Sequence, residues 1–577
     1  MRLGARVLLS SVFVTLTQLA SAYVVAKYNW HVTQFEAAFD GVTRKVFGIN
    51  GHPGCEAAIN VFVGDTIEVW LHNDIDEPTC IHWHGMRQQR TPEMDGASGI
   101  TQCSIQPGES ALYRFVATEP GSYWWHSHDS TQYVDGLRGP LIVHKKPNTL
   151  LPWEKNVYQE VTVQITDWYH EQSAVLMQQM TADPTGNEPV WDTVLVNDRG
   201  RFNCSDVENG LPCTPDQPLT RIRFVAGKKY LLRLINVAAF AAFDVSIDNH
   251  VFQVIAADGT SVQPSAPINS IFINVGQRYN ILVEAKPVNV GQQQQQYQQR
   301  PSQGQFWLRA TSKYGAPFTS LPLDQFPKGF NPNGLAIIDY DCNKPSDPTS
   351  TGWAETKTVG EFDFIPLAPP KLPLQPQQRI LAQFTMMNTT TDPVVRGYIA
   401  INKRSLRTFE MPMSPTLFEV AKGATVDDLP ASSNAVSMEF GKHIELVLVN
   451  LDAGEHPFHM HSHSLWVVGS GTAVLESIVA KSPDNLRLED PMQRDVYTVP
   501  GCKLNAAGDM CEEAGYVVLR LNADNPGVWM LHCHIDWHLA TGLAMILVEG
   551  EDILKERGLK VFSKSMLNTC AKVHQQY

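Results

Sequence analysis

The string His532-Cys533-His534, with His538 four residues later, has the residue types of a metal centre. A cysteine thiolate with two imidazoles suits a copper site that transfers electrons. In a strand, alternate residues share a face, so His532 and His534 would point away from Cys533. One strand could therefore hold a copper through sulfur on one side and further metal ions through imidazoles on the other, with only a few covalent bonds between them.

His-x-His pairs recur elsewhere in the chain. They occur in IHWHG (His82, His84), WWHSH (His126, His128) and HPFHMHSH (His459, His461, with His463 overlapping). Simple counting predicts about 0.6 such pairs by chance for this histidine content. One pair alone would indicate a strand with two hydrogen-bonded or exposed histidines. Recurrence in apolar, strand-like contexts indicates clustered ligands for copper, zinc or iron.

The sequence around these pairs predicts short strands that would position them. AAINVFVGDTIEVWLHND (57–74) predicts a hairpin-like unit that turns at Gly64-Asp65, and SALYRFVATEPGSYWWHSH (110–128) predicts another. TRIRFVAGKKYLLRLINV (220–237) and SMEFGKHIELVLVN (437–450) resemble the first unit, and we interpret all three as weak internal repeats. The spacing favours Greek-key sandwiches in an all-β protein.

The length of 577 residues predicts several domains, and units of about 130 to 190 residues would give three. We expect domains at 23–148, 149–343 and 379–577, joined by a Pro-, Ser- and Thr-rich linker at 344–378. The second domain has no His-x-His pair, so we expect it to form scaffold and pocket. The glutamine-rich run 291–305 predicts a surface loop, and DILKERG (552–558) predicts a short helix near the C-terminus.

Residues 1–22 have the features of a secretory signal. Arg2 and Arg6 precede an apolar run, and Ala20-Ser21-Ala22 is a small-x-small cleavage site before Tyr23. No other run approaches the length of a membrane span. The net charge of −14, without a basic cluster, makes nucleic acid and anionic membranes poor partners. We expect a secreted monomer without a membrane anchor, glycosylated at the sequons of Asn203 and Asn388.

Pairing of the ten cysteines stays open on sequence grounds alone. If Cys533 binds a metal ion, an odd number remains, so at least one is free or externally paired. Spacing would allow two local loops, Cys204 with Cys213 and Cys502 with Cys511. Cys55 and Cys80 could pair with each other and leave Cys342 over.

The histidine segments, taken together, resemble the multicopper oxidases. IHWHG, WWHSH, HPFHMHSH and HCHIDWHLATGL occur in that family's order, two near the start and two near the end. STQYVDGLRGPLIV and MDGASGITQC resemble fungal laccases and laccase-like pigment oxidases most, with ascorbate and iron oxidases as nearby relatives. The resemblance covers nearly the whole chain after residue 22. It implies three tandem cupredoxin-like domains and four copper ions, namely a blue type 1 copper, a type 2 copper and a type 3 pair.

The resemblance also implies ligands for each copper. The blue copper would take His456, Cys533 and His538, and the type 2 copper would take His82 and His459. The type 3 pair would take His84, His126, His128, His461, His532 and His534. His463 is the extra histidine, for which we expect a supporting or structural role.

Two further positions follow from the same resemblance. Where ascorbate oxidases carry an axial Met, this chain has Leu543, with Met545 two residues later. A leucine cannot coordinate, which favours Cu(I) and raises the potential of the blue copper, as in laccases and iron oxidases. Asp95 and Asp536 resemble acids that carry protons to the cluster during O2 reduction.

The resemblance also bears on disulfides and on the substrate pocket. It implies that Cys103 pairs with Cys570 and Cys204 with Cys213. Many laccases use a second-domain carboxylate to accept a phenol proton, and alignment through INVAAFAAFDVSIDNH puts Phe240 there, with Asp244 four residues later. We therefore expect an apolar pocket without the usual acid. Asp167 resembles a carboxylate position of iron oxidases, but relatives that do not oxidise iron also carry an acid there.

The sequence thus predicts a secreted, laccase-like oxidoreductase. It would couple one-electron oxidation of phenols to the reduction of O2 to water, with electrons entering through the exposed edge of His456 or His538, in pigment or secondary-metabolite formation. Oxidation of ferrous iron or ascorbate is one alternative. A non-catalytic copper-binding cupredoxin scaffold is another, and the complete set of ten histidines with Cys533 argues against it.

Overall fold

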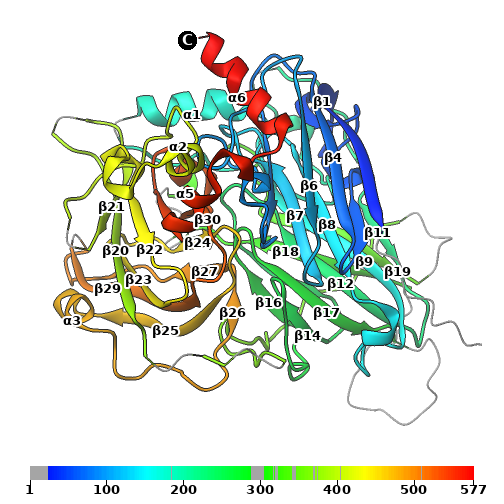
Figure 1. The fold of residues 1–577 in the computed structure, drawn as a ribbon. Coiled ribbons are helices and arrows are strands. Elements are labelled where there is room, and N and C mark those ends of the chain that lie inside the picture. Colours follow the sequence, from blue (N-terminus) through cyan, green and yellow to red (C-terminus); the bar gives the residue numbers. More distant parts are fainter. Residues whose placement is uncertain are drawn as a thin grey trace, which may run out of the picture.

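Three β-sandwiches follow one another in the computed structural model of the chain, coloured blue, then cyan to green, then yellow to red (Figure 1). The structure describes residues 24–576 except 184, 209, 287–303, 316–317, 319–321, 341–345, 368–370, 373–374, 391, 403 and 509. The expected signal sequence, nearly all of the glutamine-rich run and Cys342 lie outside the described residues.

The first sandwich consists of two four-stranded sheets. Its elements are β1 Val25–Ala37, β2 Arg44–Ile49, β3 Ile59–Phe62, β4 Thr66–Asn73, β5 Ile81–His84, β6 Ser110–Val116, β7 Gly121–Ser127, β8 Arg138–His144 and the 3-10 turns η1 Gly54–Glu56, η2 Pro92–Met94 and η3 Pro147–Thr149. The sheet orders are β2-β1-β4-β6 and β3-β8-β7-β5. Because β5 pairs antiparallel with β7, His82 lies opposite His126.

The second sandwich has a six-stranded and a five-stranded sheet, ordered β10-β9-β12-β17-β14-β15 and β11-β19-β18-β13-β16. The strands are β9 Val157–Trp168, β10 Thr193–Val196, β11 Thr220–Arg223, β12 Lys229–Asn236, β13 Phe243–Ile247, β14 Phe252–Ala257, β15 Thr260–Ser261, β16 Ser270–Ile273, β17 Arg278–Glu284, β18 Gln305–Ser312 and β19 Asn333–Asp339. Helix α1 Ser173–Ala182 and the turns η4 Cys204–Asp206 and η5 Leu323–Gln325 complete it.

The third sandwich carries most of the helices. Its strands are β20 Gln378–Met387, β21 Arg396–Ile401, β22 Ala435–Met438, β23 His443–Asn450, β24 His456–Met460, β25 Leu465–Ala473, β26 Gln493–Arg494, β27 Val496–Val499, β28 Lys503–Leu504, β29 Cys511–Asn522, β30 Gly527–Cys533 and β31 Ala544–Glu549. The helices are α2 Thr416–Lys422, α3 Leu475–Ala480, α4 Asp536–Ala540, α5 Glu551–Arg557 and α6 Lys564–Gln576, with turns η6 Val426–Asp428, η7 Ala431–Ser433 and η8 Gly558–Val561. Sheet β22-β31-β30-β24-β27 lays β30 beside β24, so that His532 faces His459.

The strand–glycine–strand repeat is present in all three sandwiches, but the prediction of hairpin-like units is wrong. The two strands of each unit do not pair, because β3 and β4, β11 and β12, and β22 and β23 lie in different sheets. The same holds for β6 and β7. In the first unit the turn contains Gly64 at a φ of 93°, a backbone conformation that glycine adopts readily. Each turn carries the chain across the sandwich, which gives the alternating strands one buried face towards a common core.

The cores of the second and third sandwiches are continuous. One cluster of buried apolar side chains runs from Val163 and Leu232 in the second sandwich to Phe458 and Leu519 in the third. A separate cluster, which includes Ile67, Val69 and Leu71 on one face of β4, fills the first sandwich. The short C-terminal helix expected from sequence is α5. No helix in the described part of the chain has the length and apolar character needed to span a bilayer.

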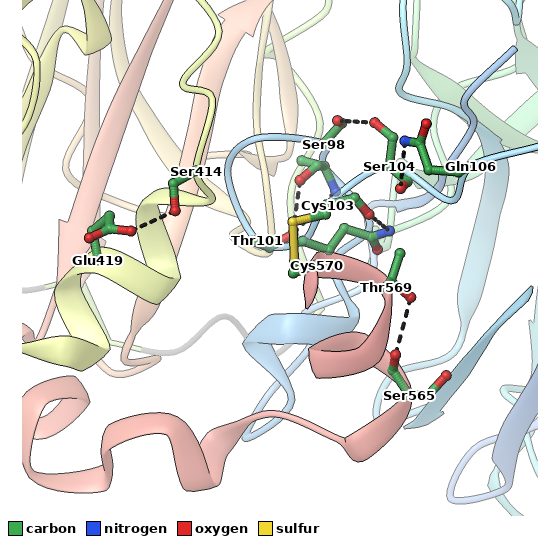
Figure 2. Close-up of a disulfide and its surroundings, with 12 residues drawn as sticks. Ser98, Thr101, Cys103, Ser104, Gln106, Ser414, Glu419, Ser565, Thr569 and Cys570 are labelled. Carbon is green, nitrogen blue, oxygen red and sulfur yellow. Dashed lines mark hydrogen bonds between the residues drawn. A yellow bond between two sulfur atoms is a disulfide. The ribbon is translucent and has the colours of Figure 1, made fainter. Parts of the chain in front are cut away.

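Within the described residues there are three disulfides, Cys103–Cys570, Cys204–Cys213 and Cys502–Cys511. Figure 2 shows the first, which ties helix α6 to the loop that follows Asp95, and Figure 1 shows α6 beside the blue strands. The possible pairing of Cys55 with Cys80 is wrong. Cys55 lies in η1 against the carbonyl of Asn197, whereas Cys80 is buried just before β5, and both are thiols.

Removal of the Cys103–Cys570 bridge by Cys570→Ser is expected to lower the unfolding free energy by about 2–5 kcal/mol, because the bridge closes a very long loop in the unfolded chain. Cys511→Ser is the matched control, since its bridge spans only 9 residues of sequence against 467 for Cys103–Cys570. Denaturant unfolding of both variants checks the prediction. A loss for Cys570→Ser no larger than that for Cys511→Ser would contradict it.

Candidate metal centre

The structure brings the eleven predicted metal-binding side chains together in two groups. Each is buried, and their ligand atoms lie within 4.8 Å of one another in sets of three. The sets are His456–Cys533–His538, His82–His84–His459, His84–His126–His534 and His128–His461–His532. The ends of β5 and β7 from the first sandwich meet the ends of β24 and β30 from the third, so the larger group lies between two domains that are distant in sequence.

The smaller group has the geometry of a sulfur–imidazole metal site. Cys533 Sγ lies 3.6 Å from His456 Nδ1 and 3.5 Å from His538 Nδ1. Burial raises the pKa of the Cys533 thiol, but the imidazoles of His538 and His456 outweigh it and lower the pKa to about 7. A thiolate is the form that binds a metal ion, so the pocket favours the ligand state.

The larger group presents ring nitrogens that lack other partners. The Nδ1 atoms of His82, His126 and His459 each donate to a backbone carbonyl, that of Asp95 at 2.8 Å and those of Ser127 and Asp495 at 2.9 Å. Their Nε2 atoms are buried and, among the described atoms, have no hydrogen-bond partner. Such a nitrogen costs free energy unless it binds something, and a donated Nδ1–H leaves its lone pair free for a metal ion.

Ring nitrogens of the larger group also face each other in pairs. His84 Nδ1 lies 3.1 Å from His534 Nε2, and His461 Nε2 lies 3.2 Å from His532 Nε2. Burial lowers the pKa of the clustered imidazoles well below the usual value, and for His128 to about 4. Neutral imidazoles are good copper ligands. Copper ions therefore fit both groups.

The two acids predicted to carry protons lie next to the histidines. Asp95 accepts from His461 Nδ1 at 2.8 Å and from Ser462 Oγ at 3.3 Å, and burial raises its pKa to about 8. Asp536 begins α4, directly after His534 and Ile535. Burial, reinforced by the charge of Asp167, raises its pKa well above the usual value, and one of its oxygens has no partner among the described atoms.

A buried charge network supports the larger group, and sequence reasoning missed it. Arg494 donates to Asp258 at 2.9 and 3.0 Å, and Arg278 donates to Asp495 at 2.6 Å. Asp495 in turn lies 3.3 Å from His84 Nε2 and accepts from His459 through its carbonyl. The network joins the second sandwich to the third and orients two of the clustered imidazoles. Charged residues scattered over 236 positions have no local pattern that could have revealed it.

Two carboxylates on the outer side of the smaller group were also missed. Glu188 accepts from His538 Nε2 at 3.0 Å, and Asp452 accepts from His456 Nε2 at 2.9 Å. Burial raises the pKa of each carboxyl, but the imidazole hydrogen bonds outweigh it, so the pKa of both is lowered. Asp452 could have been suspected from its position four residues before His456, but Glu188 is 350 residues from His538.

These carboxylates correct the predicted electron entry. His456 is fully buried and His538 is 4% exposed, so neither offers an exposed edge. The side chains of Glu188 and Asp452 are 18% and 31% exposed and cover the outer ring nitrogens. A donor in solvent would therefore meet a carboxylate first. The segment that carries Glu188 packs closely on the third sandwich at Gly186. A side chain at this position would prevent the close packing, because its Cβ would lie 2.3 Å from Val395.

The remaining predicted positions have clear surroundings. Phe240 is buried with its ring 6.3 Å from that of His538, and Asp167 accepts from the backbone N–H groups of residues 239–241 and fixes that loop. Asp244 pairs with Lys313 at 3.0 Å. His463 bonds the His461 carbonyl and Glu549, a structural role. Leu543 is buried, and its backbone is bonded to Cys533 and His538. Met545 is opposite Leu531 in the next strand.

The all-β fold and the histidine–cysteine sites define a copper protein of three cupredoxin-like domains, and comparison with known proteins gives the family. Family models described as multicopper oxidase match residues 31–148, 159–343 and 407–552. The chain belongs to the multicopper oxidases, a family of copper-dependent oxidoreductases that use O2.

Relatives within that family have different names. Laccase-2 of Cryptococcus neoformans var. grubii is 31% identical over 94% of this chain and 87% of the relative. The iron transport multicopper oxidase FET3 of Gibberella zeae is 30% identical over 97% of this chain and 82% of the relative.

Similar solved structures also include both an iron-import oxidase and a laccase. The structure of Fet3p, described as a multicopper oxidase that functions in iron import, has a TM-score of 0.78 at 25% identity and covers 95% of both chains. The laccase from Botrytis aclada has a TM-score of 0.77 at 28% identity, over 96% of this chain and 92% of that one.

Proposed function

We propose that this multicopper oxidase is of the laccase type and oxidises phenolic donors one electron at a time, coupled to the reduction of O2 to water. The observation that carries the proposal is the contact of Glu188 with His538 at 3.0 Å, beside the ring of Phe240. It replaces the expectation of a pocket without an acid, because the acid comes from a different segment than the one aligned with Phe240.

The residues around the blue-copper group have complementary roles. A set of four bound coppers would supply one-electron acceptance and the reduction of O2. Glu188, held ionised, accepts the proton of a phenol as the ring is oxidised. The hydrogen bond to His538 places that carboxylate between donor and metal site. Cys533 is bonded through the backbone to His532 and His534 and so gives a covalent path between the two groups.

Asp95 and Asp536 are our proposed proton carriers. Reduction of O2 to water consumes four protons, and both acids border the larger histidine group. Their raised pKa values favour the protonated form, in which a carboxyl can donate. Leu543 cannot coordinate, so a copper ion held by His456, Cys533 and His538 would gain no weak thioether ligand from this position, which favours Cu(I).

Ferrous iron is a second candidate donor, and a separate observation favours it. The pKa of each carboxyl, Glu188 and Asp452, is lowered, which favours the ionised form, and the two carboxylates hydrogen-bond the outer nitrogens of His538 and His456. Two carboxylates at one entrance favour a divalent cation, for which oxygen ligands are suited. Each carboxylate would also link the cation to a blue-copper imidazole through a hydrogen bond.

Oxygen uptake by the copper-loaded protein tests the proposal. The donors are a panel of phenols and naphthols, compared with ferrous iron and ascorbate. Turnover of phenols well above the other donors is expected. Preference for iron would transfer the function to the second candidate, and preference for ascorbate would overturn both.

Asp452→Asn is expected to lower kcat/KM for ferrous iron by about 10–100-fold, since it removes a charged group hydrogen-bonded to a metal ligand. Phenol oxidation is expected to depend mainly on Glu188, so Glu188→Gln lowers kcat/KM for phenols and iron together. Steady-state kinetics with both donors measures the ratio of kcat/KM for ferrous iron to kcat/KM for phenols in each variant. Glu476→Gln, on the exposed face of α3, is the control. Equal losses for both donors in Asp452→Asn would contradict separate roles.

The protein is proposed to be a secreted monomer that acts in pigment or secondary-metabolite formation. The signal-like N-terminal sequence supports secretion, and disulfides suit an oxidising compartment. Asn203 and Asn388 are exposed, which is compatible with glycosylation.

A further inference from the structure

A row of aromatic rings leads from the blue-copper histidine His538 to the surface. The ring of Phe240 lies 6.3 Å from His538 and 5.9 Å from Trp191, centroid to centroid. Trp191 lies 5.7 Å from Phe330, and Phe330 lies 5.6 Å from Tyr314. All these separations are in the range of direct aromatic contact. Trp191 is 1% exposed, whereas Tyr314 is 40% exposed.

The backbone around these rings is well anchored. Phe240 follows β12 in a loop whose N–H groups bind Asp167 at 2.8–2.9 Å. Trp191 precedes β10 on the segment that also carries Glu188, and Tyr314 and Phe330 lie near the two ends of the connection from β18 to β19. All four rings belong to the second sandwich. The row therefore lies within the second sandwich, and its inner end contacts the third sandwich at His538.

The outer end of the row is an aromatic surface. Tyr314 also contacts Phe326 at 6.0 Å, and Phe326 contacts Phe330 at 4.8 Å. Phe326 and Phe330 are half-buried. An exposed tyrosine over two partly exposed rings offers stacking surface to another aromatic group. The two electron-rich rings of the row are the phenol of Tyr314 at its surface end and the indole of Trp191 in its middle.

We propose that this row is an electron path through which the protein oxidises phenolic groups of donors too large to reach Glu188, such as phenols attached to a polymer. The proposal rests on the proposed laccase-type function. A polymer-bound phenol stacks on the surface formed by Tyr314, Phe326 and Phe330. Its electron crosses the row to His538. The packed rings provide the electronic coupling for this transfer, and the backbone does not have to move.

The electron and proton balance closes with O2 as oxidant. Each phenol O–H loses one electron and one proton and becomes a phenoxyl radical. The copper ion that His456, Cys533 and His538 would hold would accept the electron, and the proton enters water at the exposed surface. Four such events deliver the four electrons that, with four protons, convert one O2 into two waters. Trp191 Nε1 is buried without a hydrogen-bond partner among the described atoms, so no proton leaves in the middle of the row.

Flash photolysis tests the path without turnover. A ruthenium photoreductant is attached at Tyr314→Cys in a Cys55→Ser background, and blue-copper bleaching reports the electron-transfer rate. Phe330→Leu or Trp191→Leu is expected to slow transfer by about tenfold. The control label is at Val175→Cys, on the exposed side of α1, and its rate is expected to be unaffected by the same substitutions. Intact blue absorption shows that each variant has folded. Equal rates with and without Phe330→Leu would overturn the path.

A second experiment tests the donor class. The kcat/KM for a phenol coupled to dextran is divided by that for the same phenol free in solution. Tyr314→Ala is expected to lower this ratio by about tenfold. Tyr158→Ala, another exposed tyrosine, is the matched control. An unchanged ratio would overturn docking at Tyr314. If the protein oxidises neither form of phenol, the proposed function fails, and flash photolysis still decides whether the row conducts.

Discussion

Cys533→Ser is expected to abolish the blue colour and to lower donor oxidation by at least about a thousandfold. Cys533 is fully buried between His456 and His538, at 3.6 and 3.5 Å from their Nδ1 atoms. A serine hydroxyl stays protonated and lacks the soft sulfur that selects copper in a site of this kind. Visible absorption, electron paramagnetic resonance and oxygen uptake measure the effect.

Copper analysis of the same variant separates the two metal groups. The larger histidine group contains no sulfur, so Cys533→Ser is expected to lose one copper of the proposed four and to keep the others. Cys80→Ser is the matched control, because Cys80 is an equally buried thiol near His128 but belongs to neither group. Retained blue colour in Cys533→Ser, or its loss in Cys80→Ser, would refute the assignment of Cys533.

Asp258→Asn is expected to lower the unfolding free energy by about 3–5 kcal/mol, because it leaves buried arginine charge without its partner. Asp258 accepts from Arg494 at 2.9 and 3.0 Å and from the Arg278 backbone at 2.9 Å, and all three side chains are fully buried. Burial raises the pKa of Asp258, but the two arginines outweigh it and lower that pKa. The stabilisation is therefore present above the ordinary Asp pKa and is lost as pH falls through the folded-state value.

Denaturant unfolding of the copper-free protein measures this loss. Asp347→Asn is the control, since it removes an Asp–Arg pair that is 42% and 34% exposed and is expected to cost less than about 1 kcal/mol. Because Asp495 shares the network and contacts His84 and His459, Asp258→Asn is also expected to weaken copper retention. A loss equal to that of Asp347→Asn would show that the buried network does not stabilise the interface.

Much of the metal centre could be predicted from the sequence because its ligands occur in short strings. Alternation along a strand places His532 and His534 on one side and Cys533 on the other, and the same rule applies to His82 with His84. The family's motifs then indicated which strings would share a copper, and the structure brings the side chains of those strings together. The disulfide between Cys103 and Cys570 followed from the same resemblance.

Strand pairing and electron entry could not be predicted in this way. A turn such as Gly64-Asp65 can join paired strands or carry the chain between sheets, and the choice depends on burial against distant strands. The contact of Glu188 with His538 likewise depends on how the second sandwich packs on the third.

The sequence by itself determined the class of fold, the candidate metal ligands and the family, since these reside in local spacing and side-chain chemistry. Only the tertiary structure decided what surrounds those ligands: the carboxylates of Glu188 and Asp452, the Arg278–Arg494 network and the aromatic row from Phe240 to Tyr314. These groups come from segments far apart in the chain. Their positions follow from packing among three sandwiches, which no short stretch of sequence encodes.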